Sequence, residues 1–187
     1  MNNYRNSYVA SKSCHEGTIE VFQDPETGVP YHGGGTMRDL VIYEGHLMIA
    51  MTSIETDIVK LYNFKASQLL RGNNPTVRIS WPDYDVPELD QQFWLDLIGV
   101  INFKWSAREI TGVTACCVGG HGRTGTALAI LAGLTGACQS DPVAFIRKHY
   151  CKRVVESDSQ VKYIEDMTGI KVNVKPNKAF GYQSAFD

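Results

Sequence analysis

The pattern of apolar and polar residues along the chain predicts alternating strands and helices. Short runs rich in β-branched residues at positions 18–22, 76–80 and 112–118 are typical of strands. Longer segments with apolar residues at helical spacing are residues 88–107, 124–134, 141–150 and 157–167. This alternation favours an α/β fold with a central, mostly parallel sheet and helices on both faces.

The remaining segments are less regular. Residues 23–36 are rich in proline and glycine and predict a turn-rich loop, whereas residues 40–51 predict a hairpin or paired strands about Glu44-Gly45. Thr52 and Glu55 form a possible capping box for a helix that continues to about Leu70. For the segment 88–107 we expect the following core residues: Phe93, Leu95, Leu97, Ile98, Ile101 and Trp105.

Cys117 and Arg123 are separated by five residues in a glycine-rich turn between a predicted strand and a predicted helix. Such a turn can wrap around a phosphate, with backbone N–H groups pointing inward and the guanidinium taking two oxygens. The helix that follows adds its positive N-terminal end. The expected phosphate-binding residues are Val118, Gly119, Gly120, His121, Gly122 and Arg123.

The same surroundings favour a thiolate at Cys117, because a helix N-terminus and a nearby arginine lower the pKa of a thiol. Attack on phosphorus would then form a cysteinyl-phosphate intermediate. Thr124 is placed to offer its hydroxyl to the departing sulfur. Asp83, in the sequence Trp81-Pro82-Asp83, is the candidate general acid, with Asp85 as its rival.

A second chemical step needs a positioned water, and the amide of Gln160 can hold one. The chain resembles the protein tyrosine phosphatase superfamily, and most of all its compact dual-specificity-like and kinase-associated-phosphatase-like members. The resemblance rests on CVGGHGRTGT at 117–126, WPD at 81–83 and VVESDSQ at 154–160, in that order, and spans about half the chain.

The resemblance implies a set of catalytic roles. Cys117 would be the nucleophile, Arg123 the phosphate clamp, and Asp83 the general acid and then base. Thr124 would assist the leaving thiolate, and Gln160 would position water. The chain departs from the family at Cys116, where a histidine usually precedes the nucleophile, and this change could lower the rate or raise the pH optimum.

Cys116 beside Cys117 also raises the question of a vicinal disulfide, although a small buried side chain is the commoner role. A low-pKa thiolate at Cys117 would be open to reversible oxidation. The spacing of the other cysteines does not suggest a metal site, and the chemistry needs no cofactor.

The rim of the pocket bears on the substrate. His121 is expected to point outward, and the loop lacks the lysine or arginine typical of superfamily members that act on inositol lipids. The Gly33-Gly34-Gly35 run, with Tyr31 and His32, is expected to line the substrate cleft, because a nucleotide loop would need a following lysine. We expect a shallow or mixed pocket that accepts phosphotyrosine and also phosphoserine or phosphothreonine.

The overall composition bears on the number of domains, the partners and the location of the protein. The chain has 187 residues, 43% of them hydrophobic, and a net charge of −2, which favours one compact domain and gives no broad attraction for nucleic acid or membrane. We expect a single phosphatase domain over residues 1–187, with a loose N-terminus (1–15) and a tail (170–187) that packs, frays or binds a partner. Without an apolar leader or membrane span, and with a free thiol required, a cytoplasmic location is expected.

The sequence therefore predicts a phosphomonoester hydrolase that needs no metal and acts on phosphorylated proteins. Three alternatives remain open. One is a phosphatase for an inositol phosphate, a nucleotide or an RNA 5′ end. Another is a phosphate-binding module with little turnover. The third is a structural or interaction protein with a vestigial pocket, which the presence of all four catalytic groups argues against. The sequence does not indicate an oligomeric state.

Overall fold

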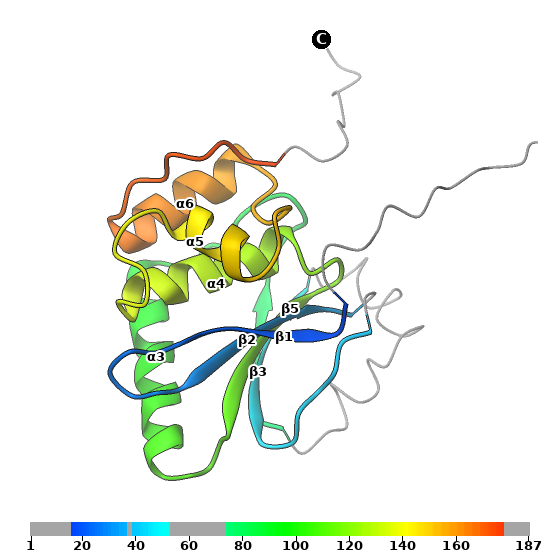
Figure 1. Ribbon diagram of the computed structural model, residues 1–187, viewed down its shortest axis with the longest axis vertical. Helices are drawn as coiled ribbons and strands as arrows, with labels where there is room; N and C mark the ends of the chain where they lie inside the picture. The colour runs from blue at the N-terminus through cyan, green and yellow to red at the C-terminus, as the bar shows by residue number, and fades with distance from the viewer. Residues whose placement is uncertain (1–15, 37–38, 53–73, 178–187) are drawn as a thin grey trace, which may run out of the picture.

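The computed structural model describes residues 16–36, 39–52 and 74–177. Its strands are β1 (Thr18–Gln23), β2 (Pro30–Gly35), β3 (His46–Thr52), β4 (Thr76–Ser80) and β5 (Gly112–Cys117). Its helices in these ranges are α3 (Gln91–Ser106), α4 (Gly122–Leu134), α5 (Pro142–His149) and α6 (Asp158–Thr168). Figure 1 shows the strands forming one sheet, with the helices packed on it.

The sheet is mixed and mostly parallel, in the order β1-β2-β5-β3-β4. β5 lies at its centre and pairs in parallel with both β2 and β3, while β4 pairs in parallel with β3. Only β1, at the edge, runs antiparallel to its neighbour. This arrangement confirms the predicted α/β sheet and places the segment after β5 at the carboxyl end of the central strand, where open α/β sheets bind their ligands.

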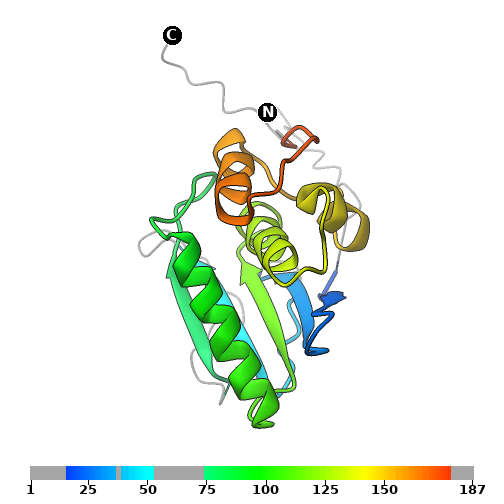
Figure 2. The ribbon, with the colours of Figure 1, turned by 90° about the vertical axis from the view of Figure 1, so that its left-hand side faces the viewer.

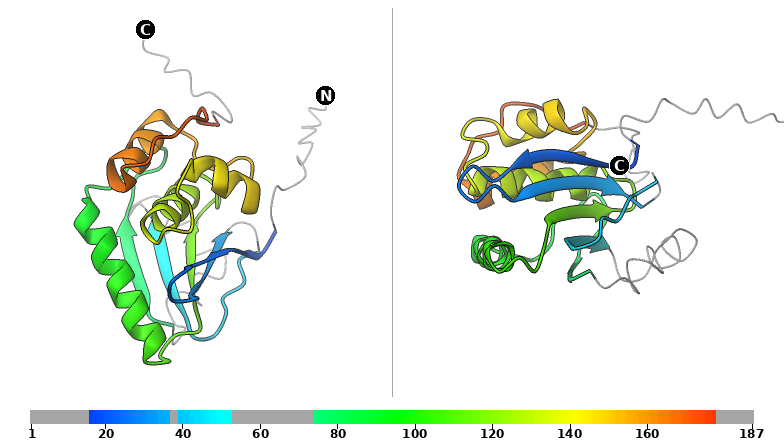
Figure 3. Two further views of the ribbon diagram at one scale, coloured as in Figure 1. Left: turned by 60° about the vertical axis from the view of Figure 1, so that its left-hand side comes forward. Right: turned by 60° about the horizontal axis from the view of Figure 1, so that its bottom comes forward.

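Alternate residues of β5 face two different hydrophobic clusters. Val113, Ala115 and Cys117 belong to the main core, to which α3 and α4 contribute Trp94 and Leu128. In Figure 2 the four helices lie in front of the sheet, and Figure 3 shows α5 over β1 and β2, with α3 at the opposite edge. The intervening residues of β5 therefore point to the other face of the sheet.

The second cluster on that other face contains Cys116, with Leu40, Met48 and Ala50. A pair of consecutive cysteines at the end of β5 is thus divided between the two faces. Only Cys117 is on the side of the helices, which is also the side where α4 begins.

Two sequence interpretations were wrong. Residues 23–36 are not one loop, because Pro30–Gly35 forms β2, a buried strand next to the centre of the sheet. Residues 40–51 do not form a hairpin, because His46–Thr52 is a single strand between parallel neighbours. In both cases the strand is fixed by pairing with β5, a partner that lies more than sixty residues further along the chain.

The predicted helix at residues 88–107 begins later, at Gln91, because the Asp90 side chain caps it by accepting from the Phe93 N–H. Its buried residues include Leu97 and Ile101 as expected, and Trp94, which was not expected. Leu95 was expected in the core but is 42% exposed.

The expected helix from Thr52 to about Leu70 lies almost wholly outside the described residues. In the first part of the tail, Val172 is buried in the main core and the Asn177 N–H donates to the Val155 carbonyl. None of the helices in the described residues is both long enough and apolar enough to cross a membrane.

Candidate active site

The predicted anion loop connects the end of β5 to the start of α4. The Gly120 N–H donates to Cys117 Sγ at 3.2 Å, so the loop curls back over the sulfur. Gly120 has a φ of +73°, a conformation that glycine adopts without strain. Cys117 is only 3% exposed and lies at the foot of the loop. An N–H aimed at sulfur stabilises a thiolate, as the proposed chemistry requires.

β2 supports the loop from one side. A Cβ added at Gly35 would lie 2.7 Å from the Gly120 nitrogen and 2.8 Å from the Gly119 carbonyl carbon, so only glycine permits this approach. The Thr36 N–H donates to the Cys117 carbonyl at 2.9 Å. The glycine run thus belongs to the scaffold of the loop. Tyr31 and His32, which were expected to line a cleft, are both buried in this strand.

Asp83 and Arg123 come together, as the sequence predicts. Arg123 Nη2 lies 3.3 Å from Asp83 Oδ1, and Arg123 Nη1 donates to the Trp81 carbonyl at 3.2 Å. Arg123 is 2% exposed, whereas the Asp83 side chain is 58% exposed. The guanidinium is therefore a buried cation at the loop, and the acid approaches it from the solvent side.

Asp85, the other candidate acid, makes its contacts within its own segment. Asp85 Oδ1 accepts from the Val86 N–H at 2.9 Å, and the Asp85 carbonyl accepts from Trp81 Nε1 at 2.7 Å. These contacts hold the shape of the segment that carries Asp83. Of the two candidate acids, Asp83 is thus the one whose side chain pairs with Arg123, and its role as the general acid stays a prediction.

Gln160 lies against the loop from the side of α6. A Cβ added at Gly122 would be 3.0 Å from Gln160 Nε2 and 2.5 Å from Glu156 Oε2, so both side chains contact the start of α4. Gln160 Oε1 accepts from the Glu156 N–H at 2.8 Å. Gln160 Nε2 is buried, and within the described part of the chain it has no hydrogen-bond partner. A buried amide N–H₂ in this position is suited to hold a water or a substrate oxygen.

Backbone strain accompanies this arrangement. Val155, just before Glu156, has a φ of +62°, which is unusual for a β-branched residue. Its carbonyl accepts from Arg147 Nη2 at 3.4 Å and from the Asn177 N–H at 2.9 Å. The strained backbone is thus held from two directions beside the residues that contact the loop.

Thr124 and His121 lie differently from what the sequence predicts. The Thr124 hydroxyl donates to the Gly34 carbonyl at 3.2 Å, and because it has one proton it does not also donate to sulfur in this arrangement. His121, expected at the rim, is instead 7% exposed and occupies the N-cap position of α4, without a side-chain capping bond. His121 is buried because the loop turns into α4 at this residue.

Cys116 does not face the loop. It is buried on the opposite side of the sheet, and burial, followed by the charge of Cys117, raises its pKa to about 12. Cys116 and Cys117 are both free thiols, so no vicinal disulfide joins them, and Cys151 is disulfide-bonded. Cys116 is therefore a neutral, buried thiol that packs on the face of the sheet opposite the loop.

Sequence reasoning missed other residues that shape the loop. Tyr150 donates its hydroxyl to the Gly120 carbonyl at 2.8 Å, and Glu156 lies beside Gly122. Glu156 lies within the VVESDSQ motif, so its proximity to Gln160 was a signal. For Tyr150 the sequence offers none, because its contact spans thirty residues.

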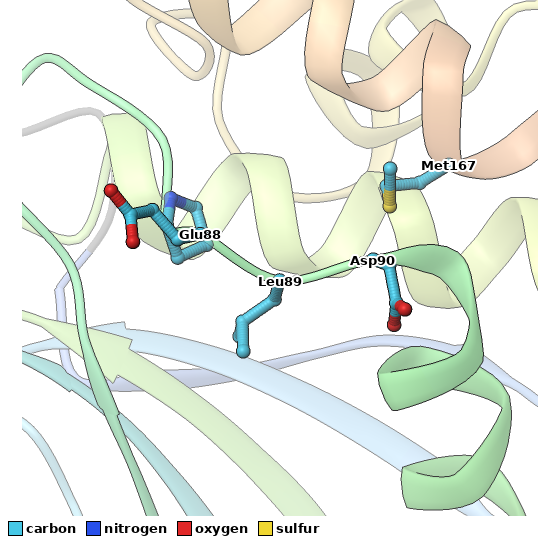
Figure 4. Close-up of a pocket in the computed structure, with 5 residues that line it drawn as sticks. Glu88, Leu89, Asp90 and Met167 are labelled. Atoms are coloured by element: carbon cyan, nitrogen blue, oxygen red, sulfur yellow. The ribbon is translucent and has the colours of Figure 1, made fainter.

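Two surface hollows adjoin the segment that carries Asp83. One is lined by residues that include Pro82, Asp85 and Phe93, and the other by residues that include Glu88, Asp90 and Met167. Figure 4 shows the second hollow between the segment leading into α3 and the end of α6. Neither is lined by Cys117 or Arg123. Among the described residues, no three His, Cys, Asp or Glu side chains are grouped as metal ligands would be.

Comparison by sequence finds relatives without an assigned activity. No known family profile matches the chain. The uncharacterized protein MJ0215 of Methanocaldococcus jannaschii is 35% identical over 97 residues, which are 52% of this chain and 57% of that protein. The uncharacterized protein MJECL20 of the same organism is 38% identical over 90 residues, 48% of this chain and 57% of that protein. The chain thus matches little more than half the length of these curated relatives.

Comparison by structure is more informative. Tk-PTP in its active form has a TM-score of 0.55 at 15% identity, over 75% of this chain and 91% of the other. PTPMT1 in complex with PI(5)P has a TM-score of 0.53 at 16% identity, over 79% of this chain and 94% of the other. Kinase associated phosphatase has a TM-score of 0.53 at 12% identity, over 78% and 90%. This chain therefore has the fold of the protein tyrosine phosphatases.

Proposed function

We propose that the protein is a phosphomonoester hydrolase that acts through a cysteinyl-phosphate intermediate. The observation that carries the proposal is the meeting of the loop from Cys117 to Arg123 with a carboxylate from a distant part of the chain. Cys117 lies under its own loop with the Gly120 N–H on its sulfur, and Arg123 pairs with Asp83 at 3.3 Å. A nucleophile, an anion clamp and an acid are what phosphoryl transfer needs.

In the first step, the substrate phosphate takes the place of the Asp83 carboxylate on the Arg123 guanidinium, because both are anions that one cation can bind. The loop N–H groups and the guanidinium stabilise the charge on the non-bridging oxygens. The Cys117 thiolate attacks phosphorus, and the bond from phosphorus to the leaving oxygen breaks. Asp83, which takes up a proton from solvent once the phosphate has displaced it from the guanidinium, donates that proton to the leaving oxygen.

In the second step, water attacks the phosphorus of the intermediate. Asp83, now a carboxylate, takes a proton from this water, and the bond from sulfur to phosphorus breaks to return the thiolate. Gln160 Nε2, which has no hydrogen-bond partner within the described residues, is the group that orients the water. No redox change occurs, and the products are an alcohol or phenol and inorganic phosphate.

The substrate class we propose is phosphorylated protein, with phosphotyrosine and also phosphoserine or phosphothreonine accepted. The buried Cys117 and the exposed Asp83 indicate that the leaving group stays near the surface while the phosphate enters the loop. Such an arrangement suits a phosphorylated side chain on a larger molecule. Arg123 is the one arginine or lysine between Cys117 and Thr124. This loop therefore has no second arginine or lysine to bind an additional phosphate.

The test is phosphate release from para-nitrophenyl phosphate and a panel of phosphopeptides, with EDTA and a reductant present. Native protein should turn over, whereas Cys117→Ser should release no phosphate while still binding it. Turnover that survives in Cys117→Ser would contradict the proposed nucleophile.

One observation supports a second candidate substrate. PTPMT1, which shares this fold, is known in complex with PI(5)P. The panel should therefore include a phosphoinositide, a nucleotide and an RNA 5′ end. Faster turnover of one of these than of any phosphopeptide would move the substrate class away from protein. Binding of phosphopeptide without release by native protein would identify a phosphate-binding module instead.

A further inference from the structure

Tyr150, which follows α5, contacts the anion loop from a distant part of the sequence. Its hydroxyl donates to the Gly120 carbonyl at 2.8 Å, and the side chain is buried. The ring lies against β2, where a Cβ added at Gly33 would be 3.0 Å from two of its carbon atoms. The tyrosine is therefore wedged between the strand that supports the loop and the loop itself.

The residue that Tyr150 holds also contacts the nucleophile. Gly120 donates its N–H to Cys117 Sγ at 3.2 Å, while its carbonyl accepts from Tyr150. Because a trans peptide is planar, its C=O and its N–H point in opposite directions. A Gly120 carbonyl fixed on Tyr150 therefore directs the next N–H, that of His121, away from Tyr150.

The alternative orientation of this peptide would be unfavourable for an anion. A glycine at φ +73° can rotate easily, and rotation would turn the Gly120 carbonyl oxygen toward the phosphate. A carbonyl oxygen repels a phosphate, whereas an N–H binds it. The hydrogen bond from the Tyr150 hydroxyl opposes this rotation, because it holds the Gly120 carbonyl on the side of Tyr150.

We propose that Tyr150 is a positioning residue that fixes the peptide between Gly120 and His121. In this orientation the loop can bind phosphate and stabilise the Cys117 thiolate. The idea builds on the anion site of the proposed function. It does not depend on turnover, because phosphate binding and thiol reactivity can be measured without it.

The test compares full-length native protein with Tyr150→Phe, which removes one oxygen and keeps the ring. Alkylation of Cys117 by iodoacetate is followed by mass spectrometry across pH 5–9, without phosphate and at increasing inorganic phosphate. We expect Tyr150→Phe to bind phosphate about three- to tenfold more weakly, the range that one lost hydrogen bond supports. The pH midpoint of alkylation should rise, because the freed peptide between Gly120 and His121 can turn its carbonyl oxygen into the loop, where it opposes a negative charge on Cys117.

The matched control is Tyr31→Phe. Tyr31 is also a buried tyrosine, it stacks on Phe22 with ring centroids 4.8 Å apart, and within the described residues its hydroxyl has no hydrogen-bond partner. Tyr31→Phe should leave both the phosphate affinity and the pH midpoint unchanged. Thermal unfolding of both variants shows whether any change merely follows a loss of stability, which a purely structural role would give without moving the pH midpoint.

The outcomes separate the two proposals. If phosphate does not protect Cys117 in native protein, the proposed anion site itself is wrong. If native protein is protected and Tyr150→Phe behaves like native protein, the role of Tyr150 is refuted. The same conclusion holds if Tyr31→Phe and Tyr150→Phe change equally.

Discussion

At the scale of single residues, Arg123 combines two tasks. Its guanidinium holds the Trp81 carbonyl and lies beside Asp83, so it shapes the segment that carries Asp83. In the proposed mechanism it also offers a cation to the substrate. Lysine would keep the charge but present no planar fork to two oxygens. The role of Arg123 therefore depends on geometry as much as on charge.

Arg123→Lys should lower kcat/KM for para-nitrophenyl phosphate about a hundredfold or more, because the clamp on the transition-state oxygens is lost. Steady-state kinetics at several substrate concentrations measure this. Arg108→Lys is the control, since Arg108 is exposed and precedes β5, whereas the loop follows the other end of that strand. Near-native kcat/KM in Arg123→Lys would contradict the assigned phosphate clamp.

Asp83→Asn should slow the reaction most for substrates with a poor leaving group, because the amide cannot protonate the departing oxygen. We expect a larger loss with a phosphotyrosine peptide than with para-nitrophenyl phosphate. The comparison variant is Asp85→Asn, whose carboxylate accepts from the Val86 N–H in its own segment. An equal dependence on the leaving group in both variants would transfer the acid role to Asp85.

At the scale of elements, β2 determines the position of the loop. Gly33, Gly34 and Gly35 each meet a different neighbour closely: the Tyr150 ring, the Leu40 side chain and the loop backbone. The run is therefore needed for packing on both faces of the strand and at its end. This explains why a segment with poor strand propensity forms a strand next to the centre of the sheet.

Gly35→Ala should reduce activity more than tenfold, because the added Cβ would lie 2.7 Å from the Gly120 nitrogen and push the loop away from Cys117. Its cost in stability should be about 1–3 kcal/mol. Gly99→Ala, in α3, is the matched control because a Cβ there has no atom within 4 Å, and alanine favours a helix. Full activity in Gly35→Ala would show that the loop does not depend on this contact.

The elements also show what the sequence could predict. The segments β4, β5 and α4 carry strong local patterns, and the structure has them close to where the sequence placed them. Cys117 and Arg123 were predicted from the five residues between them, and Asp83 from the tripeptide Trp81-Pro82-Asp83, far upstream. Their catalytic roles stay predictions. β2 and β3 were misread because their conformation depends on pairing with β5, which local propensity does not contain. The contact of Tyr150 and the burial of His121 depend on packing in the same way.

At the scale of the whole molecule, the two faces of the sheet carry different groups. The helix-covered face carries Cys117 at the foot of the anion loop, while the other face buries two histidines beside Tyr43. The rings of His32 and His46 are 4.8 Å apart, and His46 Nδ1 is 2.9 Å from the Thr114 hydroxyl. Since the histidines lie on β2 and β3, on either side of β5, their charge state affects the sheet that carries the site.

The buried histidines His32 and His46 make the stability of the fold depend on pH. Burial, and then the charge of His32, lowers the pKa of His46 to about 4, from 6.5 in an unfolded chain. Burial also lowers the pKa of His32, against the opposing effect of Glu20, whose carboxylate is 3.7 Å away. Between pH 6.5 and 4 the unfolded chain therefore binds protons that the folded protein does not.

The free energy of unfolding should consequently fall as the pH is lowered from about 6.5 toward 4, with a slope of up to about 1.4 kcal/mol per pH unit for each histidine. Urea unfolding at pH 7, 6 and 5 measures this slope. His46→Asn should flatten it, because the group that titrates is gone, whereas His149→Gln should not, because His149 is exposed. A slope that is the same in native protein and in His46→Asn would mean that other groups govern the acid sensitivity, and that the contact between the two rings carries no penalty for charge.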